Sequence, residues 1–192
     1  MNRIPLERRR WTRKEYARLG ECGIFDHDEP VELIGGDLIV SEPKGTAHAT
    51  AVGLVQDALR VAFGPGWTVR AQAPVALDEE SEPEPDVAVV PGDPREYRDE
   101  HPSQAALLVE VSESSLVLDR WRKGSLYARA GVRDYWIVNL IDDVLEVYRE
   151  PLHDVSGPFG WRYGTVETLT SDATVSPLAK PETHLRVAEL LP

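Results

Sequence analysis

The sequence predicts an α/β protein of the α+β kind, in which a mixed β-sheet is flanked by two principal helices. Three observations support this prediction. The chain has 192 residues, the usual size of one domain. Apolar residues recur at helical spacing in two long stretches, residues 47–63 and 118–130. Short apolar runs, bounded by Gly, Pro and Asp, supply the strands.

The individual elements follow from caps, breakers and periodicity. Thr12 and Glu15 form a capping box, which predicts a short helix from Thr12 to Gly20. The dipeptide at residues 35–36 is Gly-Gly and predicts the tight turn of a hairpin. Glycine follows both long helices, at Gly64 and Gly131. Strands are expected at residues 31–34, 37–40, 67–77 (broken by Pro74), 86–90, 105–112, 135–138 and 144–148, with short strands between 161 and 187.

These elements are assigned to a single domain with three parts. They are a basic N-terminal arm (1–11), a core (about 12–150) and a tail of short strands (151–192). The acidic segment 78–84 is predicted to be an exposed loop. Neither a secretion signal nor an apolar stretch of membrane-spanning length is found, and one cysteine rules out an internal disulfide. We therefore expect a cytoplasmic protein with no membrane partner.

The net charge of −12 argues against a protein that coats nucleic acid, because phosphate contacts need a surplus of Lys and Arg. The charge is unevenly distributed. Residues 1–20 carry +5, so the remaining 172 residues carry −17. The basic arm is a candidate for holding an anion, although docking onto the acidic body or simple solvation is favoured.

Several catalytic motifs are missing, including a phosphate-binding glycine loop, a dinucleotide fingerprint and a Gly-x-Ser-x-Gly elbow. The informative residues are two carboxylates in apolar strands. Asp86 opens the run Asp-Val-Ala-Val-Val, and Glu110 interrupts Ala-Leu-Leu-Val-Glu-Val. Burying a carboxylate is costly unless a cation or hydrogen-bond donors compensate. If both lie on one face, they form a site for a hard cation such as Mg²⁺. Otherwise Asp86 caps a loop and Glu110 faces solvent.

The second long helix adds polar side chains to this pattern. Asp119 and Lys123 are four residues apart and share one helix face, which Tyr127 extends by a turn. A lysine beside a metal site is suited to orient a water or to offset developing charge. The alternative is an ordinary surface ion pair. His48, near the start of the first long helix, is a candidate phosphate contact, with packing or capping as the alternative.

Taken together, these motifs resemble the Uma-two family of putative restriction endonucleases, with residues about 12–150 matching in consistent order. The matching segments are Val31–Asp37, His48, Gln72–Val75, Pro85–Val90, Leu107–Ser112 and Asp119-x-x-x-Lys123-x-x-x-Tyr127-Ala128-x-x-Gly131-Val132-x-x-Tyr135-Trp136-Ile137-Val138. The resemblance implies the restriction endonuclease-like fold of the PD-(D/E)XK superfamily, a mixed sheet flanked by helices.

The resemblance also implies roles for individual residues. Asp86, Glu110 and the backbone carbonyl of Val111 would bind Mg²⁺, for which Mn²⁺ would substitute. The superfamily's lysine belongs at position 112, where this chain has Ser, so Lys123 is expected to replace it. Glu32 is expected as a third carboxylate. At position 139 the chain has Asn where the family often has Asp, and we assign that position no role.

The sequence therefore predicts a Mg²⁺-dependent endonuclease that hydrolyses phosphodiester bonds of DNA. Asp86, Glu110 and Lys123 would be catalytic, with supporting candidates Glu32, Asp119, Tyr127 and His48. We expect a homodimer with weak non-specific affinity for DNA. One alternative is a catalytically idle nuclease fold that serves as a binding module. Another is a glycosidase carboxylate pair, which the helix lysine and the sheet-embedded acids disfavour.

Overall fold

The computed structural model describes residues 8–26, 29–41 and 44–192. Its centre is a six-stranded sheet with strand order β3-β4-β5-β6-β7-β8. Neighbouring strands are antiparallel except for the parallel pair β5–β6. The strands are β3 (Trp67–Ala71), β4 (Val87–Pro91), β5 (Leu107–Ser112), β6 (Asp134–Asn139), β7 (Val144–His153) and β8 (Trp161–Leu169). The predicted mixed sheet is confirmed.

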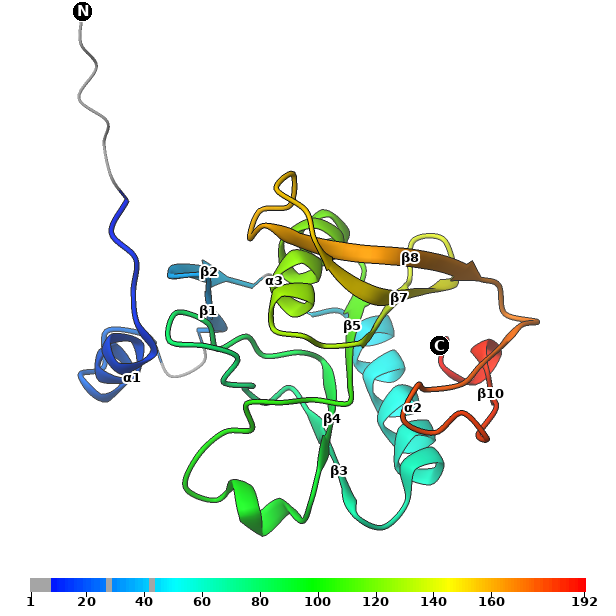
Figure 1. Cartoon of the computed structure of the whole chain (residues 1–192). Coiled ribbons are helices and arrows are strands. Elements are labelled where there is room, and N and C mark those ends of the chain that lie inside the picture. Colours follow the sequence, from blue (N-terminus) through cyan, green and yellow to red (C-terminus); the bar gives the residue numbers. More distant parts are fainter. Residues whose placement is uncertain (1–7, 27–28, 42–43) are drawn as a thin grey trace, which may run out of the picture.

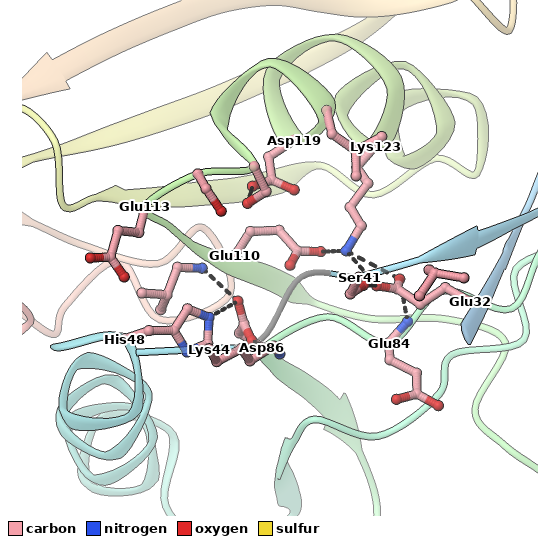
Figure 2. A pocket seen from close by; sticks show the side chains of 15 residues that line it. Glu32, Ser41, Lys44, His48, Glu84, Asp86, Glu110, Glu113, Asp119 and Lys123 are labelled. Atoms are coloured by element: carbon pink, nitrogen blue, oxygen red, sulfur yellow. Dashed lines mark hydrogen bonds and ion pairs between the residues drawn. The ribbon is translucent and has the colours of Figure 1, made fainter. Parts of the chain in front are cut away.

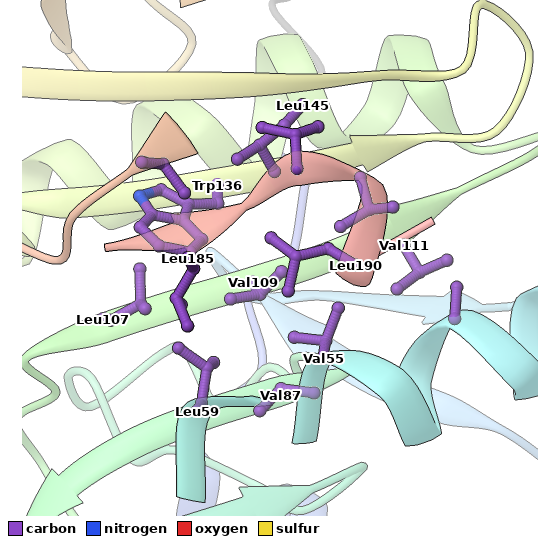
Figure 3. Close-up of a cluster of buried hydrophobic side chains, with 14 of the residues drawn as sticks. Val55, Leu59, Val87, Leu107, Val109, Val111, Trp136, Leu145, Leu185 and Leu190 are labelled. Atoms are coloured by element: carbon purple, nitrogen blue, oxygen red, sulfur yellow. The ribbon is translucent and has the colours of Figure 1, made fainter. Parts of the chain in front are cut away.

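Helices cover both faces of this sheet (Figure 1). The first face packs against α2 (Thr46–Phe63), whose apolar stripe meets Val87, Val109 and Trp136 in the core shown in Figure 3. On the opposite face lie a π-helical turn, η2 (Leu118–Lys123), and the helix that continues it, α3 (Gly124–Arg129). The shorter elements are α1 (Arg13–Glu21), β1 (Val31–Ile34), β2 (Asp37–Val40), η1 (Pro94–Tyr97), β9 (Thr174–Val175), β10 (Leu185–Arg186) and η3 (Val187–Glu189).

The local signals in the sequence act as predicted. Thr12 and Glu15 form the capping box of α1. Gly35 and Gly36 have φ of 58° and 79°, which matches the left-handed turn that joins two antiparallel strands with right-handed twist. The strand expected at residues 67–77 is shorter than predicted and ends at Ala71. Gln72, with φ of 47°, turns the chain out of the sheet at that point.

The acidic segment 78–84 was predicted to be an exposed loop, and this prediction is wrong. Ser81 and Pro83 are buried, and only Glu79 is exposed. Arginines from α1, from α3 and from the chain before α1 neutralise the segment, in the pairs Arg10–Glu80, Arg13–Glu82 and Arg129–Asp78. The described part of the basic arm therefore docks on the acidic body. Arg3 lies outside the described residues.

The tail beyond residue 150 contributes more to the fold than the sequence suggested. β7 continues to His153, and β8 forms an edge of the central sheet. Leu185, Val187 and Leu190 are buried in the core beneath α2. Of the helices in the described ranges, none has the length and apolar character required to span a membrane.

Candidate active site

Asp86 and Glu110 lie opposite each other at the end of two paired strands. β4 and β5 are antiparallel, with Val87 facing Val109, so the register extended by one residue sets Asp86 against Glu110. Opposed residues of antiparallel strands share a face. Both side chains are buried, each residue 3% exposed. The alternative in which Glu110 faces solvent is therefore wrong.

The two carboxylates line a cavity of about 280 Å³ (Figure 2). α2, β5, η2 and the chain that follows β2 contribute its walls. Its charged side chains are the carboxylates Glu32, Glu84, Asp86, Glu110, Glu113 and Asp119 and the ammonium groups Lys44 and Lys123. The cavity is thus acidic and contains two cations.

Lys123 brings the helix to the sheet carboxylate. Its Nζ lies 3.1 Å from Glu110 Oε1 and 3.1 Å from Glu32 Oε2. The Tyr127 hydroxyl donates to the same Glu110 Oε1 at 2.6 Å. Glu110 Oε2 accepts no hydrogen bond from the residues that the structure describes. One oxygen of Glu110 is therefore held in place while the other remains available at the cavity.

A π-helical turn places Lys123 in this position. The amide of Gly124 donates to the carbonyl of Asp119, five residues earlier, and the Tyr135 hydroxyl donates to the same carbonyl at 3.1 Å. The Asp119 side chain instead accepts from Ser115 Oγ at 2.6 Å. Asp119 and Lys123 are 2% and 4% exposed, so the alternative of a surface ion pair between them is wrong. Single-turn π segments are frequent at functional sites.

Asp86 is fixed by three donors. His48 Nε2 lies 3.1 Å from Asp86 Oδ2, and the Val111 amide donates to the same oxygen at 2.8 Å. Lys44 Nζ donates to Asp86 Oδ1 at 2.7 Å. Sequence reasoning missed Lys44, which stands in a Pro-Lys-Gly segment with no periodicity. In an extended strand the amide and carbonyl of one residue point to the same side, so the Val111 carbonyl points to the β4 side of β5, as its amide does.

The carboxylates differ in their electrostatics. Burial raises the pKa of Glu110 well above its usual value, and the charges of Asp119, Asp86 and Glu32 add to this effect. Burial also raises the pKa of Asp119. For Asp86 the cost of burial is outweighed by the hydrogen bond from His48 and the charge of Lys44, so its pKa is lowered.

The surrounding carboxylates have the opposite effect on the lysine. Burial alone would lower the pKa of Lys123, but the negative charges of Glu110 and Glu32 raise it. The raised pKa favours the charged ammonium form of Lys123, which suits a fixed positive charge better than a base. This matches the role of a charge that orients a water or offsets negative charge.

Glu32 is less suited to a third ligand position than the sequence implied. Its carboxylate accepts from Lys123, from Ser41 Oγ at 3.0 Å and from the Glu84 amide at 3.0 Å. Within residues 8–26, 29–41 and 44–192, no three His, Cys, Asp or Glu side chains gather closely enough to hold a metal ion. The donor set that fits a hard cation is two carboxylates and a carbonyl, from Asp86, Glu110 and Val111.

Comparison with known families decides the relationship. The model of the Uma2 family, described as "Putative restriction endonuclease", matches residues 13–188. The chain belongs to the Uma2 family. The match includes residues 151–188, which the sequence motifs did not cover. Every residue of the acidic cavity lies inside the matched range.

A solved structure shares the fold. It is titled "Crystal structure of a putative nuclease belonging to DUF820 from Anabaena variabilis ATCC 29413". The two structures superpose with a TM-score of 0.65 at 19% identity, covering 90% of this chain and 96% of the other. Among curated proteins, none matches this chain. The restriction endonuclease-like arrangement predicted from the motifs is therefore confirmed at the level of the fold.

Proposed function

We propose that this protein is a metal-dependent endonuclease that hydrolyses phosphodiester bonds of DNA. The observation that carries the proposal is the placement of Lys123 Nζ at 3.1 Å from Glu110 in a cavity also lined by Asp86. These side chains come from a helical turn, a strand and the residue before another strand, and all three line the same cavity. The description of the Uma2 family and the printed title of the structural neighbour support nuclease activity.

Asp86, Glu110 and the Val111 carbonyl would hold the metal, Mg²⁺ or Mn²⁺. Hard oxygen ligands of this kind suit both ions. The unengaged Oε2 of Glu110 and the side of Val111 that faces Asp86 support this assignment. A metal held by these residues would supply polarisation of the phosphoryl group and would make an attacking water more acidic.

The protein's own side chains supply positioning and charge. Lys123 orients the water or offsets the negative charge that develops on the phosphoryl group. Tyr127 holds Glu110 through Oε1, and Glu32 holds Lys123 from the other side. His48 and the Val111 amide fix Asp86 Oδ2. His48 is thus a positioning residue, because its Nε2 is directed at Asp86.

Acidity limits how this protein would hold DNA. Arg10 of the basic arm is paired with Glu80 and Arg13 of α1 with Glu82, so these two arginines are poor candidates for the grip on DNA. Affinity for non-specific DNA should be weak and strongly dependent on salt. The homodimer and the cytoplasmic location stay predictions.

A plasmid cleavage assay with Mg²⁺ or Mn²⁺ tests this proposal. We expect Asp86→Asn and Lys123→Gln each to lower the rate by at least about 100-fold, the scale of losing one electrostatic group at a catalytic centre. Asp57→Asn is the matched carboxylate control, since its side chain is 80% exposed on α2. Lys180→Gln, outside the cavity, is the lysine control.

Two outcomes would contradict the proposal. One is a wild-type protein that cuts no DNA with either metal, and the other is cleavage by both variants at the wild-type rate. Calorimetric titration with Mn²⁺ then tests the alternative of a catalytically idle binding module. A catalytically idle binding module need not retain a divalent-cation site, so absence of both cleavage and metal binding would favour it.

A further inference from the structure

Lys44 donates a hydrogen bond to Oδ1 of Asp86, the oxygen that the buried donors do not reach. Asp86 Oδ2 accepts from His48 and from the Val111 amide, whereas Oδ1 accepts from Lys44 Nζ at 2.7 Å. The Asp86 side chain is 4% exposed and that of Lys44 is 37% exposed. The buried carboxylate is therefore neutralised by an ammonium group that reaches it from the solvent side of the cavity.

The two ammonium groups of the cavity differ in how firmly they are held. Lys123 is 5% exposed at its side chain and is shared between Glu32 and Glu110. Lys44 pairs with Asp86 alone among the described residues and retains access to solvent. Of the cations that line this cavity in the described structure, Lys44 is the one free to change its partner.

A divalent cation and Lys44 compete for the same carboxylate. A metal bound by Asp86 and Glu110 needs lone pairs on Asp86, and Oδ2 already accepts two hydrogen bonds. The metal ion and the ammonium group would also repel each other, because both are positive and both would contact the Asp86 carboxylate. Metal binding at Asp86 must therefore weaken or displace the ammonium group on Oδ1.

An anionic substrate needs that displaced charge. Six carboxylates and two ammonium groups line the cavity, so its net negative charge repels a DNA phosphate. Lys44 lies just before Gly45, the N-cap of the 18-residue helix α2, which has neither a side-chain cap nor an acidic residue in its first turn. The partial positive charge of a helix N-terminus adds to the ammonium group at the same place.

We propose that Lys44 changes partner during the reaction. In the metal-free protein it is the counter-ion of Asp86; the metal displaces it, and the freed ammonium group binds a phosphate of the DNA backbone at the cavity. This inference rests on the proposed function and adds a substrate-binding residue to it. It also explains how an acidic cavity takes up a polyanion. The metal binds first and releases the ammonium group of Lys44, which then binds the phosphate.

The substitution Lys44→Gln separates the two roles because they shift in opposite directions. Titration with Mn²⁺ alone should show metal binding about fivefold tighter, since the competing ammonium group is gone. Fluorescence anisotropy with a labelled DNA duplex in Ca²⁺ should show weaker binding by a similar factor. The slope of log affinity against log salt should fall by about one, the signature of one lost phosphate contact.

Three further variants frame the test. Lys44→Arg keeps the charge and should stay near wild type in both measurements, whereas Lys44→Ala should repeat the effect of Lys44→Gln. Lys180→Gln removes a lysine outside the cavity and should change neither. Thermal unfolding of each variant checks that the fold is retained, which the exposure of Lys44 favours.

The outcomes distinguish this inference from the function on which it rests. Unchanged or weaker Mn²⁺ binding by Lys44→Gln would overturn the competition, and unchanged DNA affinity would overturn the phosphate contact. If the wild-type protein binds Mn²⁺ and cuts DNA while Lys44→Gln shows no opposing shifts, only this inference fails. If the wild-type protein binds no Mn²⁺, both fall together.

Discussion

Glu110 and Glu146 are two buried carboxylates in one row of the same sheet, yet their surroundings differ. Glu110 on β5 faces Ile137 on β6, and Ile137 faces Glu146 on β7. Each glutamate is 3% exposed. Glu110 lines the cavity and Glu146 does not. The two residues thus share strand geometry and burial but differ in the groups that satisfy them.

Glu146 is saturated with donors. The guanidinium of Arg120 reaches both of its oxygens, with Nε 3.0 Å from Oε2, and Tyr148 and Asn139 donate at 2.7 and 2.9 Å. Although burial raises its pKa, these hydrogen bonds outweigh burial and lower it. Glu110 receives both of its donors on one oxygen, and its pKa is raised.

The difference distinguishes a structural carboxylate from a reactive one. A carboxylate can accept hydrogen bonds on both oxygens from one arginine guanidinium and two further donors. Such a carboxylate stabilises the fold and has no free lone pair for a ligand. A carboxylate held on one oxygen, beside a cavity and with a perturbed pKa, is the usual sign of a functional site. Burial alone does not separate the two cases.

Cleavage activity should show the largest difference between them. If Glu110 holds the metal as proposed, Glu110→Gln should lower the rate of plasmid cleavage by at least about 100-fold, because an amide replaces the carboxylate at the proposed metal site. Glu146→Gln should leave the rate within about threefold of wild type. Quantitative nicking assays at saturating Mn²⁺ measure both.

The free energy of unfolding provides the matched control. Here Glu146→Gln should have the larger effect and Glu110→Gln the smaller one. Glu146→Gln should lower the free energy of unfolding by about 1–2 kcal/mol, since it weakens charge-assisted hydrogen bonds to a partly exposed Arg120. Glu110→Gln should cost little in metal-free buffer. Equal loss of activity in both variants would show that the row of glutamates acts through the fold alone.

The pH dependence of stability should differ in sign. The folded pKa of Glu110 is raised above its ordinary 4.5, so its contribution is present below that pH and is lost as the pH rises. The folded pKa of Glu146 is lowered, so its contribution is present above 4.5 and is lost as the pH falls. Urea unfolding between pH 3 and 8 with a chelator measures both in the glutamine variants.

Relative to wild type, Glu110→Gln should therefore gain stability with rising pH, and Glu146→Gln should lose it. Profiles of the two variants that run parallel would contradict the assignment. Asp57→Asn, at an exposed position on α2, serves as the reference for a carboxylate without a buried environment.

The smallest effect is expected from the acidic segment 78–84, whose carboxylates resemble Glu146 in being paired with arginine. Arg10→Gln breaks the pair with Glu80, in which both side chains are partly exposed. It should change the free energy of unfolding by less than about 1 kcal/mol and DNA affinity by less than about twofold. Anisotropy measured beside Lys44→Gln tests this. An equal loss of DNA affinity in Arg10→Gln and Lys44→Gln would show that the basic arm contacts DNA after all.

Much of the site could be predicted because its parts lie within regular elements. Asp86 and Glu110 stand in apolar strands, where an isolated acid is conspicuous, and Lys123 and Tyr127 follow helical spacing. Their meeting followed from a resemblance that fixes their order along the chain. The hairpin and both long helices were predicted from glycine turns and periodicity.

The rest depends on long-range pairing that leaves no local signal. Lys44 lies in a segment without periodicity and reaches Asp86 across 42 residues. The burial of segment 78–84 depends on arginines from α1 and α3, far away in the sequence. Its composition, acidic and rich in proline, is that of an exposed loop until those partners are known.

The π-helical turn makes the site sensitive to chain length. Each residue of a helix advances its side chain by about 100° around the axis. Deleting one residue within Leu118–Lys123 would convert the turn into ordinary α-helix and swing either Asp119 or Lys123 away from the cavity. The angular phase of one turn thus sets the position of the lysine. A chain with one residue fewer in this turn would keep the fold but could not direct both Asp119 and Lys123 at the cavity.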